Sequence, residues 1–246
     1  MNPLHRAEEV LLRGLGGVLL GFIVLPLIAL FLAGGLGGLL TGMSSPLVWP
    51  ALRLSLLSAS ASVLLLGLLG TPLAWLLARS RGRSERVLQS LVALPSVMPP
   101  AVAGLALLLA FGRHGVLASL LGVCPSVAFT GAAVVLAAAF VSAPLYLQAA
   151  VSAFRAIDPG LILVARALGA SPLRLFLRIA VPLALPGLLA GAITSWARAL
   201  GEFGATLMFA GNLTGRTQTL PLAVYTAMES DLDAARALAT VLVSVA

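Results

Sequence analysis

The sequence predicts an all-α membrane protein, a polytopic bundle of about six transmembrane helices. Of its 246 residues, 60% are hydrophobic and only 9% are charged, and the mean hydropathy is +1.10, far above that of soluble domains. Apolar runs of about 18 or more residues recur along the chain, which is the length that a helix needs to cross a bilayer. Because these runs are continuously apolar and do not alternate, they favour helices over the strands of a membrane barrel.

The apolar runs place the spans in order along one transmembrane domain of residues 1–246. We expect spans near 10–33, 51–78, 87–112, 131–153 and 183–210, and a last one over 234–246. The run from Gly14 to Ala33 is longer than a signal-peptide core and ends without a convincing cleavage site, so we interpret it as a span. The last run covers only ~20 Å of a ~30 Å hydrocarbon core, so we expect the natural chain to continue beyond Ala246.

The distribution of arginine predicts the orientation of the spans. All fifteen basic residues are arginine, and the alternating connections place ten of them on one side: Arg6, Arg13, Arg79, Arg81, Arg83, Arg86, Arg155, Arg166, Arg174 and Arg178. The other side carries Arg53, Arg113, Arg216 and Arg236. The positive-inside rule makes the first side cytoplasmic, with both termini, so we expect a multi-pass protein of a bacterial or archaeal inner or plasma membrane. The basic charge then reflects topology and indicates no nucleic-acid partner.

Several functional classes find no support in the residues. The chain has no lysine, so it cannot carry the lysine of a phosphate-binding P-loop, and we expect no ATP site in this subunit. His5, His114 and the lone Cys124 are too few and too scattered to predict a metal site or a disulfide. The sequence shows no nucleophile with a matching base and no paired carboxylates, so it predicts neither catalytic residues nor an enzyme.

The connection at 155–182, predicted to be cytoplasmic, has the signals of a short helical hairpin. Asp158 and Pro159 are typical of a helix start, Gly169 of the residue just after a helix, and Ser171 with Pro172 of a second start. Helical spacing predicts one shared apolar face in each helix: Leu161, Val164, Ala165 and Leu168 in the first, and Leu173, Phe176, Leu177 and Ala180 in the second. Taken on periodicity alone, this hairpin could equally be a loop packed under its own bundle.

The same hairpin resembles the EAA loop of binding-protein-dependent ABC importer permeases. That family has E-A-A, three residues, Gly, nine residues and I-x-L-P. Gly169, Ile179 and Pro182 stand at the family's spacing, whereas Leu163 replaces the glutamate, Val164 the first alanine and Val181 the leucine. The lost carboxylate removes one family contact and leaves the hairpin signals intact.

The resemblance implies a type I ABC importer permease whose hairpin is a coupling-helix pair that docks on a separate ATPase subunit. The expected docking residues are Ala165, Arg166, Gly169, Ser171, Pro172, Arg174, Phe176, Arg178, Ile179 and Pro182. The implied partners are two ATP-binding-cassette subunits that bind ATP and magnesium, a periplasmic oxyanion-binding protein, a second copy of this chain and membrane lipid. No cofactor is expected in this subunit.

The resemblance extends from residue 51 onward and indicates a substrate class. The stretches 94–113 and 197–228 resemble molybdate/tungstate permeases most, and the run Gly215–Leu222 favours them over the sulfate and thiosulfate permeases, which are similar around Gly201–Gly204. The implied function is to pass a tetrahedral oxyanion inward by alternating access. A sulfate or thiosulfate permease stays an alternative, and so does an ion-coupled secondary transporter that titrates Glu202.

Two groups of intramembrane residues are candidates for the transport pathway. Pro95, Pro99 and Pro100 would kink the third span, which membrane proteins tolerate inside a bundle or beside a cavity. The resemblance implies that this span lies near the pathway, and the alternative is a kink that serves packing alone. Arg198 and Glu202 lie four apart in the fifth span, and charge at that depth must face protein or water. The two residues form either a self-neutralising structural pair or part of the pathway, and the sequence supports both equally.

The polar connection after the fifth span is a candidate for the periplasmic gate or docking surface. Arg216 offers a guanidinium fork, and Thr217, Gln218 and Thr219 are neutral donors able to meet an oxyanion without trapping it. The alternative is an ordinary loop in which Gly215 and Pro221 turn the chain.

Overall fold

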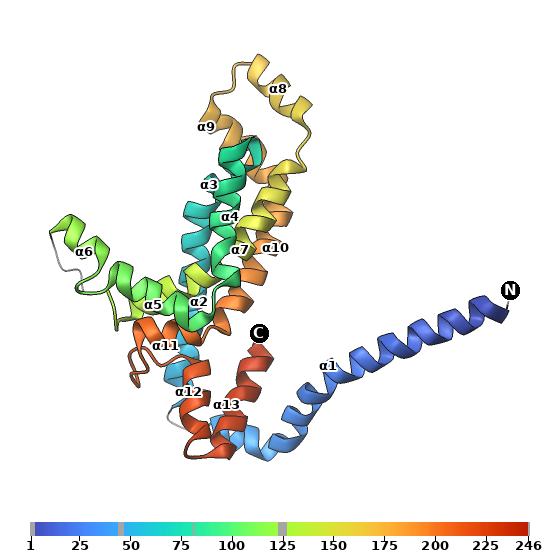
Figure 1. Cartoon of the computed structure of the whole chain (residues 1–246), viewed down its shortest axis with the longest axis vertical. Coiled ribbons are helices and arrows are strands. Elements are labelled where there is room, and N and C mark those ends of the chain that lie inside the picture. The colour runs from blue at the N-terminus through green and yellow to red at the C-terminus, as the bar shows by residue number, and fades with distance from the viewer. Residues whose placement is uncertain (1–2, 44–46, 81, 123–126, 246) are drawn as a thin grey trace. The chain divides into compact units, whose positions relative to one another are not determined.

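The computed structural model of the chain describes residues 3–43, 47–80, 82–122 and 127–245, and every regular element in these ranges is a helix. This confirms the predicted all-α class. The chain divides into two compact units, one of residues 1–49 with 223–245 and one of residues 50–222. Each unit is described by itself, and Figure 1 labels the helices of both.

The first unit contains the first and last helices of the chain. The helix α1 (Pro3–Met43) includes the apolar stretch Leu11–Leu32, of mean hydropathy 2.7, in which no side chain is buried. It contacts α13 (Leu232–Val245), whose start is capped by the Asp231 carboxylate, which accepts from two backbone amides of the first turn. The helix α12 (Leu220–Met228) leads into this unit.

The second unit is a bundle around one long central helix. That helix, α7 (Gly131–Arg155), contacts α3 (Thr71–Arg79), α4 (Arg83–Val97) and α10 (Val181–Leu200), and Figure 1 shows these four side by side. The helix α2 (Val48–Leu65) continues through a π-helical turn, Leu66–Gly70, into α3. The core of this bundle includes Leu77, Leu147, Phe154, Ala184 and Leu188.

Small residues bring α7 and α10 into close contact. A Cβ atom added at Gly187 would lie 2.5 Å from the Cβ of Ala153, and one at Gly191 would lie 2.8 Å from the Cβ of Ala149. These glycines lie four residues apart on one face of α10, and such spacing lets helix backbones approach closely in a membrane. Neither position therefore has room for a larger residue.

The third predicted span, 87–112, is not one continuous helix. The helix α4 ends at Val97, and α5 (Pro100–Phe111) begins three residues later, because Met98 and Pro99 are both extended, with ψ of 136° and 135°. A residue that precedes proline is disfavoured in the helical region, and two successive prolines therefore stop the helix where a single one, Pro95, is accommodated. The apolar segment long enough to span here is Pro100–Leu120, which ends within α6 (Val116–Leu121).

The fifth predicted span, 183–210, is also divided. The helix α10 ends at Leu200, and α11 (Gly204–Ala210) follows after a turn at residues 201–203. This second helix packs on α5 and α7 around a separate core that includes Leu107, Val134 and Phe209.

Within the described residues, five helical stretches are long and apolar enough to cross a membrane: Leu11–Leu32, Val48–Arg79, Pro100–Leu120, Gly131–Arg155 and Pro172–Leu200. The first, second and fourth predicted spans correspond to three of these stretches. The last predicted span corresponds to α13, which has 14 residues.

Candidate functional site

The predicted hairpin is present at one end of the second unit, as Figure 1 shows. Its first helix is α8 (Pro159–Ala167), and the Asp158 carboxylate accepts from the Gly160 amide at 2.8 Å. The helix ends in a Schellman turn: Gly169, at φ +79°, donates to Arg166 O and Ala170 donates to Ala165 O. Glycine is required at this turn because other residues rarely adopt a positive φ.

The second helix of the hairpin differs from the prediction in its buried face. It begins as α9 (Pro172–Leu175), where the Ser171 hydroxyl accepts from the Arg174 amide, and continues through a π-helical turn, Phe176–Ala180, into α10. Leu175 and Ala180 are buried, whereas Leu173 and Leu177 are exposed. Of the predicted face of Leu173, Phe176, Leu177 and Ala180, Phe176 and Ala180 pack against the bundle, but Leu173 and Leu177 do not, because a π turn has a longer repeat than the 3.6 residues assumed.

An aromatic cluster anchors the base of the hairpin to the bundle. Phe176 lies with its ring 6.0 Å from that of Trp75 in α3 and 6.3 Å from that of Phe154 in α7. Trp75 and Phe154 meet edge to face at 5.3 Å. The hairpin is therefore fixed at its base through Phe176.

The outer part of the hairpin is apolar and uncovered in this chain. Leu163 is 71% exposed and Leu168 is 83% exposed. Beside them is an open groove of about 610 Å³ between α8 and the start of α10, lined by Leu161, Val164, Ala165, Leu168, Ala170, Arg174, Arg178, Ile179, Pro182 and Leu183. Five of the ten predicted docking residues thus line one groove, namely Ala165, Arg174, Arg178, Ile179 and Pro182, whereas Arg166 lies on another side of α8.

The break between α4 and α5 lines a small cavity together with a charged residue of α10. The cavity measures about 310 Å³ and is lined by Pro95, Ser96, Met98, Pro100, Ala103, Val141, Leu145 and Arg198. The structure thus brings together three of the five predicted pathway residues, Pro95, Pro100 and Arg198. Pro99 caps α5 and its carbonyl accepts from the Ala103 amide, but it does not line the cavity.

Arg198 and Glu202 form an ion pair, but they differ in exposure. Arg198 Nη1 donates to Glu202 Oε2 at 2.8 Å, and the arginine side chain is 36% exposed against 2% for the glutamate. Glu202 lies in the turn beyond α10, where its other oxygen, Oε1, accepts from the Ala205 amide at 2.9 Å in the first turn of α11. Glu202 therefore joins the two helices and orients Arg198, which alone of the pair reaches the cavity.

The connection after α11 buries most of its polar side chains. Thr217, Gln218 and Thr219 are each at most 5% exposed, whereas Arg216 is exposed. The Thr217 hydroxyl donates to Gly211 O and accepts from the Leu213 amide, which ties the loop to itself. The Leu220 amide donates to the buried Ser55 hydroxyl of α2 at 2.8 Å. Only Arg216 of the four gate candidates thus presents its side chain to the surroundings.

Sequence reasoning missed the side chains that complete these sites. Ser96 and Met98 line the cavity beside Arg198, and Trp75 with Arg79 forms part of the hairpin base. The spacing of Trp75 and Arg79, four residues apart at the end of an apolar span, was a readable signal of a membrane boundary. Ser96 gave no such signal because its role depends on the break at Met98 and Pro99.

Comparison with known proteins gives relatives over nearly the whole chain. A family model described as binding-protein-dependent transport system inner membrane component matches residues 70–246. The chain is 44% identical to the molybdenum transport system permease protein ModB of Mycobacterium bovis over 245 residues, which are 99% of this chain and 92% of that protein. It is 41% identical to the ModB protein of Escherichia coli over 186 residues, 74% of this chain and 80% of that one.

Solved structures resemble the chain in fold. One is a bacterial ABC transporter involved in the import of the acidic polysaccharide alginate, with a TM-score of 0.75, 16% identity and coverage of 98% of this chain and 93% of that chain. Another is the MetNI methionine ABC transporter in inward facing conformations, with a TM-score of 0.64, 19% identity and coverage of 81% and 89%. At these identities the likeness concerns the fold.

Proposed function

The chain belongs to the binding-protein-dependent transport system inner membrane components, and on that premise we propose that it is the permease subunit of an ATP-driven importer of molybdate or tungstate. The observation that carries the substrate is the 44% identity to a molybdenum permease over 99% of the chain. The oxyanion passes from a periplasmic binding protein to the cytoplasm.

The exposed hairpin supports a docking role toward an ATPase. Its leucines and the neighbouring groove leave an apolar surface at the tip of a segment whose base is fixed by Phe176. Such a surface can bury an anchor from a partner, while Arg174 and Arg178 at the groove can form charge-assisted bonds with it. The partner subunits bind ATP and magnesium and supply the hydrolysis.

The cavity at the helix break supports a pathway role for Arg198. A guanidinium held by Glu202 faces a space bounded by Ser96 and by the prolines of α4 and α5. One cation, already partly neutralised by its carboxylate, would meet a tetrahedral dianion weakly, which suits a conduit that must release it. Glu202 acts as the positioning residue in this arrangement.

Alternating access follows from the connection of these two sites. Closure of the ATPase subunits moves the hairpin, and α7 and α10, which flank it in sequence, carry the motion toward the helix break. The binding protein delivers its ion when the cavity opens outward. In this proposal the permease is a homodimer with two ATPase subunits, its hairpins and both termini lie in the cytoplasm, and lipid surrounds its spans.

Transport in proteoliposomes tests the function. The permease, reconstituted with the ATPase and binding protein encoded beside it, should accumulate radioactive molybdate only with internal ATP and loaded binding protein. Excess tungstate should compete and excess sulfate should not. Competition by sulfate instead of tungstate would support the sulfate permease, and uptake that is abolished by a collapsed proton gradient and needs no ATP would support the secondary transporter.

The exposed Arg216 gives a test of the gate. If its guanidinium belongs to the outer gate or to the docking surface, Arg216→Ala reduces uptake and weakens the stimulation of ATP hydrolysis by loaded binding protein. Basal hydrolysis and assembly remain, because the hairpin is unchanged. Unchanged uptake and stimulation would reduce 212–219 to an ordinary surface loop.

A further inference from the structure

A second cavity lies between the base of the hairpin and the bundle, apart from the groove and from the helix break. It measures about 630 Å³, and its charged lining residues are Arg79 at the end of α3, Arg155 at the end of α7 and Arg166 of α8. Apolar residues, among them Ile162 and Leu163, form other parts of its wall, and none of the described residues that line it is acidic. The pocket is thus basic with apolar walls.

The spans place this pocket at the membrane boundary. Arg79 is the last residue of the apolar stretch Val48–Arg79, and Arg155 is the last residue of Gly131–Arg155. Residues that end a span lie at the level of the lipid headgroups, and Trp75, one turn before Arg79, is a residue type enriched at that level. The ends of these spans therefore place the pocket at the depth of the lipid phosphates.

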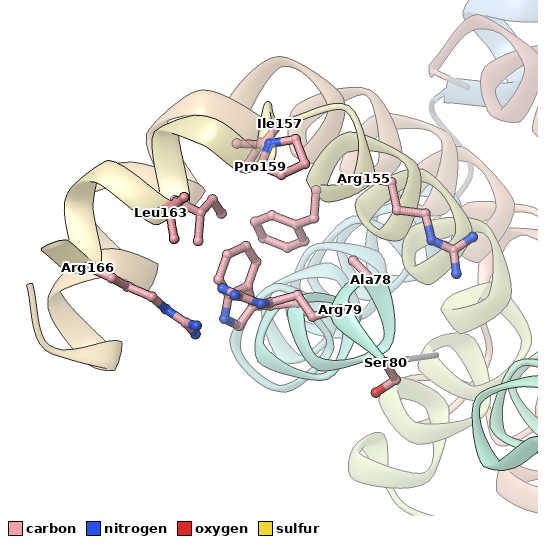
Figure 2. A pocket seen from close by; sticks show the side chains of 11 residues that line it. Ala78, Arg79, Ser80, Arg155, Ile157, Pro159, Leu163 and Arg166 are labelled. Atoms are coloured by element: carbon pink, nitrogen blue, oxygen red, sulfur yellow. The ribbon is translucent and has the colours of Figure 1, made fainter. Parts of the chain in front are cut away.

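Of the two converging arginines, Arg79 is held in position by an aromatic ring before any ligand arrives. The guanidinium of Arg79 lies 4.5 Å from the centre of the Trp75 ring, and Trp75 is itself packed against Phe154. Figure 2 shows the side chains of Arg79 and Arg166 extending toward one another from α3 and α8, whereas that of Arg155 points away. Two like charges directed into one space favour an anion between them, and the planar fork of arginine suits the oxygens of a phosphate.

We propose that this pocket binds the headgroup of an anionic phospholipid, with Arg79 and Arg166 on the phosphate and the apolar wall against the glycerol and upper acyl chain. A phosphate group is the shared chemistry of a lipid and of a free phosphate ion, and the position at the span ends selects the lipid. Basic pockets of this kind between membrane helices are typical sites for acidic headgroups. The inference goes beyond the transport function and holds whichever oxyanion is carried.

Native mass spectrometry of the purified full-length permease, alone and assembled with its ATPase, tests the site. The probes are dioleoyl phosphatidylglycerol, dioleoyl phosphatidylcholine and inorganic phosphate. We expect phosphatidylglycerol to be retained at least about tenfold more tightly than phosphatidylcholine, with Arg79→Gln reducing that preference about fivefold, the effect of one cation at a charged surface. Arg79→Lys, which keeps the charge, should retain most of the preference, and the melting temperature without lipid shows that each variant is folded.

The matched control is Arg113→Gln, an exposed arginine after α5, away from the hairpin, and it should keep the full preference. Equal binding of both lipids by the wild type, or equal losses in Arg79→Gln and Arg113→Gln, would overturn the proposal. Displacement of the lipid by millimolar inorganic phosphate would assign the pocket to a free anion. Loss of the lipid when the permease assembles with its ATPase would assign the pocket to an acidic side chain of that partner. Either of these two results would contradict a lipid site.

Discussion

The hairpin at 158–182 and the segment at 198–219 differ in which side chains they expose and which they bury. The hairpin leaves Leu163 and Leu168 exposed, whereas the second segment buries Glu202 and Thr217 and bonds both within the chain. Exposed leucines outside a span require another surface, since water is a poor environment for them. Glu202 and Thr217 thus have their polar contacts within the chain, whereas no described residue of the chain covers the leucines of the hairpin.

The largest effect on stability among these tests is expected from a substitution at Glu202, in the segment that pairs its buried polar groups. Glu202→Leu removes the carboxylate from Arg198 and from the Ala205 amide, so it should lower the free energy of unfolding by about 2 to 4 kcal/mol, because two charged hydrogen bonds are lost and a part-buried guanidinium is left unpaired. Thermal unfolding in detergent measures this. The double variant Arg198→Met with Glu202→Leu should recover much of the stability but not the uptake, if Arg198 serves the pathway. Wild-type uptake by the folded double variant would reduce the ion pair to a structural role.

A smaller effect is expected in the loop after α11. Thr217→Val leaves the Leu213 amide and the Gly211 carbonyl without the hydroxyl, which should reduce the free energy of unfolding by about 1 to 3 kcal/mol. Thr219→Val is the matched control, because the buried Thr219 hydroxyl finds no hydrogen-bond partner within the described chain. That variant should be neutral or more stable in the same thermal scan. Equal losses in both variants would contradict the bonding assigned to Thr217.

A substitution at the turn of the hairpin should reduce transport more than it reduces stability. Gly169→Val imposes a β-branched residue at a φ of +79°, at a local expense of about 1 to 2 kcal/mol, and misdirects α8 relative to α9. ATP-driven uptake should fall strongly at equal membrane abundance, while Gly169→Asn, a residue that tolerates this conformation, should retain most of it. Normal uptake by Gly169→Val would contradict a coupling role for the hairpin.

The smallest effect on stability is expected at the tip of the hairpin. Leu168→Gln changes a side chain that is 83% exposed, so the unfolding of the isolated permease should shift by less than about 0.5 kcal/mol. Co-purification with the ATPase should nevertheless weaken if this leucine is buried in the complex. Undiminished assembly would show that the exposed surface of the hairpin serves some other contact.

Local chemistry made the caps of the hairpin predictable. Asp158, Gly169 and Ser171 act through bonds to residues at most five positions away, and each occupies the position that its side chain or its freedom at positive φ favours. The helix boundaries were therefore readable without any knowledge of the bundle. The apolar face of the second helix was predictable only for Phe176 and Ala180, because nothing local in 176–180 indicates the π turn that leaves Leu177 exposed.

The burial of the polar loop and the position of the cavity were not predictable in this way, because they depend on contacts beyond a single helix. The burial of Thr217 depends on how 211–219 folds back, and the cavity at Arg198 depends on where α4 and α5 separate around it. The pair Pro99 and Pro100 carried the information for that separation, although the apolar run across it suggested one continuous span. Hydropathy measures the apolar character of a segment, so it does not register a break of two residues in the helix itself.

The close contact of α7 and α10 gives the hairpin a rigid support. The chain enters the hairpin from α7 and leaves it into α10, and Gly187 and Gly191 press the two helices together along the face next to Ala153 and Ala149. Two rods joined along their length resist bending far more than either rod alone. In the proposed coupling, a displacement of the hairpin tip would tilt α7 and α10 together as one unit, and a bulkier residue at Gly187 would loosen this pairing without changing the hairpin or the pathway.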